Sequence, residues 1–247
     1  MIKRLSILAC LFLAACSAGA KSGDQAVIAR LAKQVHVKPS AIAATPIPNL
    51  YRVQLGPRVD YITADGKYFI RGEIFDIKSG RNLTAADRAK ARLVSMKKLS
   101  QSDMIVFAPP HPTSQITVLT DIDCEFCRLL ERERPALNSM GVEVRYMFFP
   151  RDGMGTASWK KAVAVSCAKD KKAAFLAAMS GKPVKSPHCN AASVVAGYQF
   201  GQMLGIDGTP AIITQRGRMI DGYLPLPALV SVLGLNPHKG SAASATD

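Results

Sequence analysis

Two cysteines separated by two residues, Cys124 and Cys127, have the spacing of a reversible thiol–disulfide pair. A strand is expected just before them and a helix from Cys124 onward, which places the first sulfur at a helix N-terminus. The unpaired N–H groups and partial positive charge there stabilise a thiolate and lower its pKa below the free value of ~8.5. We therefore expect Cys124 to be the exposed nucleophile and Cys127, one turn later on the same face, to resolve the mixed disulfide.

A zinc site and an inert bridge are two other interpretations of this pair. A zinc site needs two further ligands at matching spacing. Cys167 has no close cysteine or histidine partner, and His188 is adjacent to Cys189 rather than spaced from it, so we predict no metal site and no cofactor. A structural bridge that closes so small a loop stabilises little through chain entropy, which makes an inert role weak.

The tripeptide Gly208-Thr209-Pro210 is a second candidate element of the site, because an apolar strand follows it from Ala211. A proline at the head of a strand is one of the places where a cis peptide bond occurs. A cis bond would bring Thr209 beside the cysteine pair and leave its backbone free to pair with an extended substrate. An ordinary trans proline between loop and strand explains the spacing equally well, so both interpretations stay open.

The first twenty residues have the features of an export signal. Lys3 and Arg4 supply a positive start, and the apolar run that follows is too short to span a bilayer as a permanent helix. Two cleavage patterns compete. Residues 18–20 (Ala-Gly-Ala) fit an A-x-A site, whereas residues 13–16 (Leu-Ala-Ala-Cys) resemble a lipobox in which Cys16 becomes lipidated. Both predict an exported protein, either free or anchored through Cys16.

Export to an oxidising compartment favours disulfides. Four cysteines remain for pairing after the signal segment, and four cysteines allow three connectivities. A reversible Cys124–Cys127 pair leaves Cys167 with Cys189. A bridge between these two closes a longer loop and would stabilise the fold by roughly 3 kcal/mol in the entropic model, so we interpret it as structural.

Composition and charge exclude several other classes of protein. Apolar residues make up 48% of the 247 residues, enough for a packed core in one large domain or two small ones. The net charge is +14, but the lysines and arginines are scattered. Aromatic residues are sparse, with a single Trp, so nothing indicates a nucleic-acid surface. We expect a folded protein with a solvated basic surface.

The residues around the cysteine pair follow a strand–helix–strand pattern. A strand over 116–120, a helix over 124–138 that Pro135 kinks, and a strand over 142–149 predict a right-handed parallel crossover. Three helical stretches, a hairpin and a last helix follow, over 157–168, 171–179, 191–204, 211–214 with 218–223, and 226–233. This domain is predicted over 113–236. The small polar residues over 237–247 are expected to be disordered.

The residues before this domain have a different pattern. A helix over 24–34 is followed by alternating strands over 51–55 and 59–63, a hairpin turn at Asp65-Gly66 and a further strand over 68–75. Residues 21–80 therefore indicate a small α+β domain with an antiparallel sheet. The edges of such a sheet are exposed, and a second copy of the chain would cover them.

A helix rich in alanine, lysine and arginine connects the two domains. It is predicted over 85–99, with Thr84 as its N-cap. Three prolines between 109 and 112 then mark another boundary. We interpret residues 81–112 as a linker, although a surface helix of one continuous domain has the same pattern.

Several of these segments together resemble the DsbC/DsbG family of bacterial periplasmic disulfide isomerases. The resemblance covers nearly the whole mature chain. It rests on residues 117–124 (TVLTDIDC) before the second cysteine, 144–146 (VRY), 149–151 (FPR), 167–171 (CAKDK), 208–211 (GTPA), 65–67 (DGK) and 222–223 (GY). Each motif alone is weak, but the combination is specific.

The resemblance implies a thioredoxin-like catalytic domain with a helical insertion, preceded by a small cystatin-like α+β dimerisation domain and a linker helix. It implies a periplasmic homodimer whose two sites face each other across a cleft. The implied partners are misfolded or mis-bridged exported proteins and a DsbD-like membrane thiol reductase that donates electrons. No nucleic acid is implied, and the membrane is implied only if Cys16 is lipidated.

The family's site residues carry over by position. Cys124 corresponds to the nucleophile and Cys127 to the resolving cysteine. Thr209 and Pro210 correspond to the substrate-binding cis-proline loop. The remaining pair corresponds to the structural bridge, Cys167 with Cys189.

The two residues between the cysteines depart from the family, whose members usually carry Gly-Tyr or Pro-Tyr. Here they are Glu125 and Phe126, with Asp121 and Asp123 just upstream. We assign Asp123, Glu125 and Phe126 to redox tuning. Three carboxylates near Cys124 oppose the helix terminus, so we expect a higher pKa of Cys124 and a more reducing couple than in the usual member.

The leading interpretation is an enzyme that isomerises or reduces incorrect disulfides through a mixed disulfide on Cys124. Two alternatives stay open. One is a DsbG-like reductase that protects single cysteines. The other is a holdase chaperone that binds unfolded chains by apolar contact. The enzyme requires Cys124 and the holdase does not.

Overall fold

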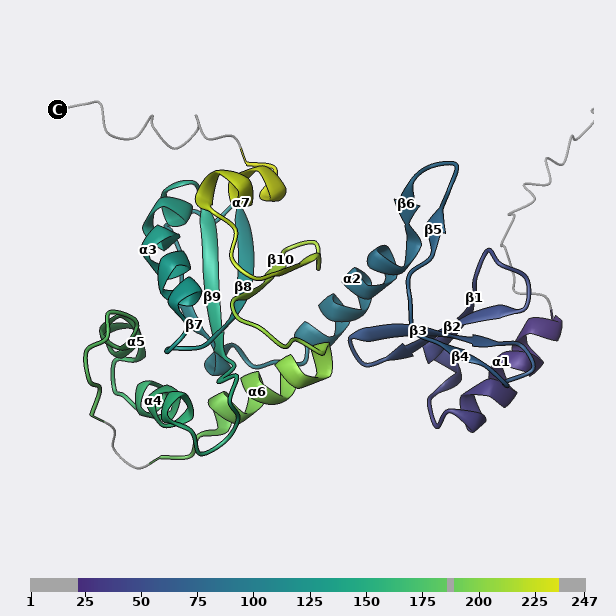
Figure 1. Ribbon diagram of the computed structural model, residues 1–247, viewed down its shortest axis with the longest axis horizontal. Coiled ribbons are helices and arrows are strands. Elements are labelled where there is room, and N and C mark those ends of the chain that lie inside the picture. The colour runs from purple at the N-terminus through teal and green to yellow at the C-terminus, as the bar shows by residue number, and fades with distance from the viewer. Residues whose placement is uncertain (1–21, 186–188, 236–247) are drawn as a thin grey trace, which may run out of the picture.

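The computed structural model describes residues 22–185 and 189–235. The predicted signal segment, the lipidation of Cys16 and the tail over 237–247 lie outside the described residues. The described chain forms two units of helices and sheet, joined by a long helix (Figure 1). Within these two ranges, no helix has the length and apolarity needed to cross a membrane.

The first unit is an antiparallel sheet that packs against one long helix. Its elements are α1 (Ser22–Gln34), a 3-10 helix (Pro39–Ala41), β1 (Ile42–Ala44), β2 (Leu50–Leu55), β3 (Arg58–Thr63) and β4 (Phe69–Ile70). The strand order is β1-β2-β3-β4. Alternation along β2 places Tyr51 and Val53 in one buried cluster with Leu31 of α1, which is the pattern of a sheet with one apolar face.

The prediction of one continuous strand over 68–75 is wrong. β4 pairs with β3, whereas β5 (Phe75–Asp76) pairs with β6 (Arg81–Asn82) in a separate two-stranded sheet. The chain leaves one sheet and enters the other between these strands, around Gly72. Apolar residues on both sides of the change, over 68–70 and 74–75, are typical of a strand but do not identify its pairing partner.

α2 (Leu83–Met96) is the helix between the units, and its predicted N-cap is wrong. The side chain of Asn82 accepts a hydrogen bond of 2.8 Å from the Ala85 N–H and caps the helix. Thr84 lies inside the first turn, fully buried, where its hydroxyl is hydrogen-bonded to Tyr61. The predicted cap therefore ties α2 to β3 instead.

α2 also contacts a tight turn of the second unit. Arg92 donates from Nε to the Gly217 carbonyl at 2.8 Å. Gly217 has φ +78°, and a Cβ at this position would collide with the Ala89 carbonyl and the Leu93 side chain. Glycine thus allows the hairpin turn to lie directly on the helix.

The second unit is a five-stranded mixed sheet. Its strand order is β11 (Met219–Asp221), β10 (Ala211–Thr214), β8 (Ser114–Thr120), β9 (Val142–Phe148) and β7 (Ile105–Phe107). β8 and β9 are parallel and are joined by α3 (Glu125–Ser139), as a parallel pair requires, while the other pairs are antiparallel. The segment predicted as a connector therefore contributes the edge strand β7, after a 3-10 helix (Gln101–Asp103).

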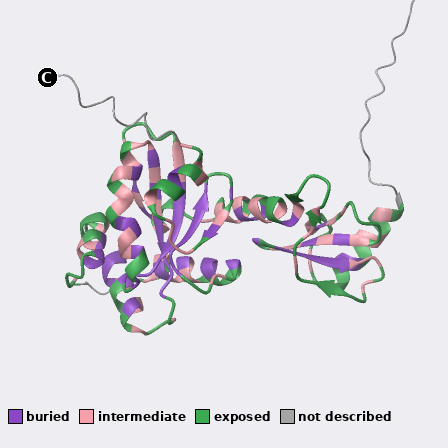
Figure 2. Cartoon of the chain, turned by 45° about the horizontal axis from the view of Figure 1, so that its top comes forward, coloured by how far each residue is buried: buried purple, intermediate pink, exposed green. Residues whose placement is uncertain are grey.

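Helices cover both faces of this sheet (Figure 1). They are α4 (Ala157–Ser166), α5 (Lys171–Met179), α6 (Ala192–Leu204) and α7 (Leu226–Leu233), besides α3. Val118 and Tyr146 belong to a core shared with α3, α5 and α7, whereas Leu119 and Met147 belong to one shared with α6. Figure 2 shows that the buried residues follow the central strands. The sheet thus fixes the end of β8, from which the cysteine pair projects.

Candidate active site

Cys124 and Cys127 lie where β8 gives way to α3. Cys124 is the N-cap of α3, with extended φ and ψ of −84° and 122°, and Cys127 is in the first turn. Both thiols are free. The expectation that Cys124 is exposed is wrong: it is 3% exposed, and Cys127 is 1% exposed. Cys124 is covered in part because its Sγ lies 3.2 Å from the carbonyl oxygen of Thr209, which belongs to a distant loop.

That loop contains the Thr209–Pro210 peptide bond, which is cis. Thr209 is 7% exposed, and its hydroxyl has no hydrogen-bond partner among the described residues. Directly after the loop, Ala211 pairs with Leu119 of β8. Because β10 and β8 are neighbours in the sheet, the loop before β10 lies next to the end of β8, where the cysteine pair begins.

The two sulfurs have opposite tendencies to ionise. The Cys127 thiol, acting as hydrogen-bond donor, is the largest influence that lowers the pKa of Cys124, to about 5. Burial opposes this shift, while the Cys127 N–H and the charge of Arg151 add to it. Burial, followed by the Cys124 sulfur, raises the pKa of Cys127. One sulfur is therefore a thiolate at neutral pH and the other a protonated thiol.

The pKa of Cys124 lies below that of a free thiol although carboxylates are near it, and the expectation that it exceeds that of the usual family member stays a prediction. Asp123 accepts hydrogen bonds from Lys161 at 2.6 Å and from Arg128 at 3.5 Å, so its charge is compensated. Asp121 is also compensated, by a cation described next. The sequence showed the three acidic residues but not the cations that the fold brings to them. The assignment of Glu125 and Phe126 to redox tuning stays a prediction.

Asp121 is the centre of a hydrogen-bond network beneath the cysteine loop. It is 1% exposed and accepts from the Asp123 N–H at 2.9 Å and the Ser158 hydroxyl. It also accepts from the backbone N–H and Nε of Arg151, at 3.0 and 3.2 Å. Burial alone would raise the pKa of Asp121, but these hydrogen bonds hold it below its ordinary value. The network joins the loop before α3 to the start of α4.

Arg151 is a candidate site residue to which the sequence assigned no role. Burial would lower its pKa, but the hydrogen bond to Asp121 and the nearby Cys124 sulfur raise it. Its guanidinium is held by Asp121 and places a fixed positive charge near Cys124. The only signal was its place in the family-like motif over 149–151.

Glu131 is a second residue that the sequence analysis missed. It lies one turn after Cys127 on α3 and is 7% exposed. Arg134 donates to its Oε1 at 2.7 Å, while its Oε2 and the Tyr146 hydroxyl are buried without a hydrogen-bond partner in the described chain. Burial raises the pKa of Glu131. The spacing of four residues from Cys127 places both on one helix face and was the available signal.

Phe126 forms an aromatic surface beside the cysteines. Its side chain is 55% exposed and stacks on Tyr223, with ring centroids 6.1 Å apart and an interplanar angle of 24°. The Tyr223 hydroxyl donates to Glu133 of α3 at 2.8 Å, and this hydrogen bond holds the Tyr223 ring in place. The exposed ring of Phe126, two residues after Cys124 in the sequence, can contact apolar side chains of another chain.

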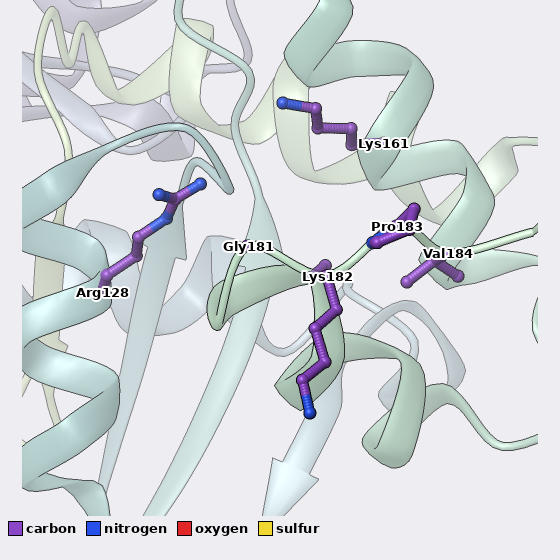
Figure 3. A pocket seen from close by; sticks show the side chains of 7 residues that line it. Arg128, Lys161, Gly181, Lys182, Pro183 and Val184 are labelled. Carbon is purple, nitrogen blue, oxygen red and sulfur yellow. The ribbon is translucent and has the colours of Figure 1, made fainter.

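A pocket beside α3 is lined by basic side chains, among them Arg128 and Lys161. Figure 3 shows Arg128 and Lys161 extending toward the same space, with Pro183 and Val184 along its wall. Lys182 points away from this space. In the part of the chain that the structure describes, no cluster of three or more His, Cys, Asp or Glu side chains is arranged to hold a metal ion.

Cys167 and Cys189 are joined by a disulfide, with their Cα atoms 5.7 Å apart. Cys167 is the C-cap of α4, and Cys189 precedes α6. The bridge therefore connects two parts of the helical insertion and lies outside the loop that carries the reactive pair.

The sheet, the crossover helix and the two cysteines at its start define a thioredoxin-like thiol–disulfide exchange enzyme. Residues 18–85 match the family model described as "Disulfide bond isomerase protein N-terminal domain", and residues 100–235 match "Thioredoxin-like domain". The thiol:disulfide interchange protein DsbC of Escherichia coli is 35% identical over 213 residues, which cover 86% of this chain and 88% of the relative.

Two further curated relatives carry the same name. That of Salmonella typhimurium is 34% identical over 211 residues, covering 85% of this chain and 87% of the relative. That of Dickeya dadantii is 31% identical over 245 residues, covering 99% of each. The chain therefore belongs to the DsbC family of thiol:disulfide interchange proteins. The predicted family, fold class and enzymatic function are confirmed.

Proposed function

We propose that this enzyme isomerises, and secondarily reduces, incorrect disulfides in exported proteins, with Cys124 as nucleophile and Cys127 as resolving thiol. One observation carries the proposal. The Cys124 sulfur, whose pKa is lowered to about 5, lies at the N-terminus of α3 and 3.2 Å from the Thr209 carbonyl, with a protonated thiol beside it. This arrangement favours attack by one sulfur only.

The first step is attack of the Cys124 thiolate on one sulfur of a substrate disulfide. A Cys124–substrate bond forms, the substrate S–S bond breaks, and the other substrate sulfur leaves as a thiolate. That thiolate, or another substrate cysteine, attacks a substrate disulfide or the mixed disulfide. The chain leaves with its sulfurs paired differently and Cys124 is a thiolate again, so isomerisation consumes no electrons.

Reduction is the branch in which Cys127 acts. Its thiol loses a proton and attacks the Cys124 sulfur, which releases the second substrate thiolate and leaves a Cys124–Cys127 disulfide. The substrate gains two electrons and the enzyme loses two. A dithiol donor must then restore the pair, and we assign this role to a DsbD-like membrane thiol reductase.

The Thr209–Pro210 loop and the Phe126–Tyr223 stack are the proposed substrate contacts. The Thr209 carbonyl faces the reactive sulfur, and the aromatic pair offers exposed apolar area beside it. An extended peptide that presents its cysteine to Cys124 would pass along this loop, where backbone hydrogen bonds read no particular sequence. This fits an enzyme that accepts many misfolded or mis-bridged chains.

We also propose a periplasmic homodimer that assembles through β4. This strand is the last in its sheet, so one edge has no neighbouring strand among residues 22–185 and 189–235. Tyr68, Phe69 and Ile70 are 65%, 43% and 43% exposed, which is costly apolar area for a monomer. Pairing of two β4 edges would cover it and bring two catalytic units into one molecule. Molar mass by light scattering should halve for Ile70→Asp.

Refolding of scrambled ribonuclease in a thiol buffer tests the catalytic assignment. The wild-type enzyme should restore ribonuclease activity, and Cys124→Ala should restore none above the buffer rate. Cys127→Ala should keep part of the isomerisation but lose reduction of insulin, because only the reductive branch needs the second sulfur. Isomerisation by Cys124→Ala equal to the wild type would overturn the proposal and point to a holdase.

A further inference from the structure

A cavity of about 690 Å³ lies where the linker helix meets both units, away from the cysteine pair. Its lining comes from β3, from α2, from the end of α6 and from β11. The charged residues among the lining are four arginines and two carboxylates: Arg58, Arg88, Arg92, Arg218, Glu73 and Asp221. Positive charge therefore exceeds negative charge by two in this cavity.

Arg92 is the most informative of these residues because it is a buried cation to which no carboxylate of the described residues is bonded. It is 8% exposed, and its Nε donates to the Gly217 carbonyl. Its terminal guanidinium nitrogens have no acceptor, and it takes part in no ion pair within the described ranges. Burial, followed by the charge of Arg88, lowers its pKa, and Asp221 only partly opposes this. A buried charge of this kind is normally compensated by a partner.

Glu73 does not supply that partner, and two other arginines of the cavity also lack an acidic partner among the described residues. Arg88 is bound to Glu73 at 3.1 Å, which uses up one of the two carboxylates. Arg58 and Arg218 are exposed and form no ion pair in the described part of the chain. Three guanidinium groups thus border one cavity with Asp221 as the single unpaired acid.

We propose that this cavity binds a small multivalent oxyanion of the phosphate or pyrophosphate class, held by Arg92 from within and by Arg58 and Arg218 from the rim. Guanidinium groups offer paired N–H donors that match the oxygens of such anions. Arg58 belongs to β3 and Arg218 lies just before β11, so the bound anion contacts both units of the chain. It therefore also fixes the junction between them.

Calorimetric titration of the purified protein with pyrophosphate, and separately with phosphate, at low ionic strength tests this site. We expect saturable binding of one anion per chain. Arg218→Met and Arg58→Met should each weaken it by about tenfold, the worth of one charge-assisted hydrogen bond. Arg92→Met should weaken it further, with circular dichroism to confirm that the fold persists.

Arg216→Met is the matched control. Arg216 is exposed, lies in the same hairpin turn and borders a different cavity, so it removes the same charge without touching this site. Its affinity should stay within about twofold of the wild type. Absence of saturable binding, or equal weakening by Arg216→Met and Arg218→Met, would overturn the proposal, because the attraction would then belong to the net charge of the protein.

Discussion

The Sγ of Cys124 lies 3.2 Å from the carbonyl oxygen of Thr209, a residue 85 positions later in the chain. The thiol form donates a hydrogen bond to this carbonyl, whereas the thiolate accepts hydrogen bonds from the Cys127 thiol and N–H. The same contact helps to cover Cys124, which is 3% exposed. Reactivity at this site is therefore set by ionisation and by the neighbouring loop together.

Removal of the second sulfur should make the first one less acidic. In Cys127→Ala the strongest influence that lowers the pKa of Cys124 is lost, so this pKa should rise by about 1–2 units, the worth of a hydrogen bond to a charge. Ultraviolet absorbance of the thiolate during a pH titration measures it. A variant that still titrates near the wild-type value of about 5 would contradict the assigned cause.

Arg151 should contribute a smaller electrostatic effect. Arg151→Gln removes a positive charge near Cys124, so the pKa of Cys124 should rise, but by less than in Cys127→Ala because this charge is the weakest of the identified influences. Arg151→Lys keeps a charge and should recover part of the shift. The same titration, with alkylation rates at fixed pH, measures both variants. A titration curve of Arg151→Gln that overlays the wild type excludes this role.

Asp121 should stabilise the fold in a pH-dependent way. Its pKa is lowered in the native state, so its contribution is present above the unfolded value near 3.8 and is lost as pH falls through the native pKa. Asp121→Asn should lower the free energy of unfolding by about 3 kcal/mol at neutral pH, as for other broken buried pairs. Urea unfolding should show this gap narrowing below pH ~4. If the difference in unfolding free energy between Asp121→Asn and the wild type is the same at neutral pH and below pH ~4, Asp121 is not ionised in the native state.

Glu131 should act in the opposite direction. Its native pKa is raised by burial, so the stability of its neutral form is present below the unfolded value near 4.5 and is lost as pH rises through the native pKa. The stability of Glu131→Gln relative to the wild type should therefore improve as pH rises. Glu125→Gln, an exposed change on the same helix, controls for the lost charge. A pH-independent difference between Glu131→Gln and the wild type contradicts the shift.

Local patterns were sufficient to predict the cysteine pair, the crossover around it and the helical insertion. The spacing of Cys124 and Cys127, the apolar strands and the helix signals all act over a few residues. The partners of Asp121 could not be found in this way, because Arg151 and Ser158 lie 30 and 37 residues away and come together only when β9 and α4 pack. For the same reason the sequence showed acidic residues near the site without their cations.

Two errors came from features that local patterns do not encode. The burial of Cys124 depends on a loop from the far end of the domain, whereas a helix N-terminus by itself is usually exposed. The strand over 68–75 is predicted as continuous because apolar residues lie on both sides of the change from one sheet to another, at 68–70 and at 74–75. In both cases the missing information was the identity of a neighbour.

One chain here holds two sulfur pairs in opposite states, with Cys167 and Cys189 bonded and Cys124 and Cys127 open. For the proposed exchange cycle to run without opening the bridge, the Cys167–Cys189 pair must have the lower reduction potential, so that electrons offered to the molecule go to the reactive site first. Any dithiol donor that restores the enzyme must be able to reduce the Cys124–Cys127 disulfide but not the Cys167–Cys189 disulfide. The two pairs therefore limit the reduction potential of the donor to a range, and the potential of the Cys167–Cys189 bridge is the lower limit of that range.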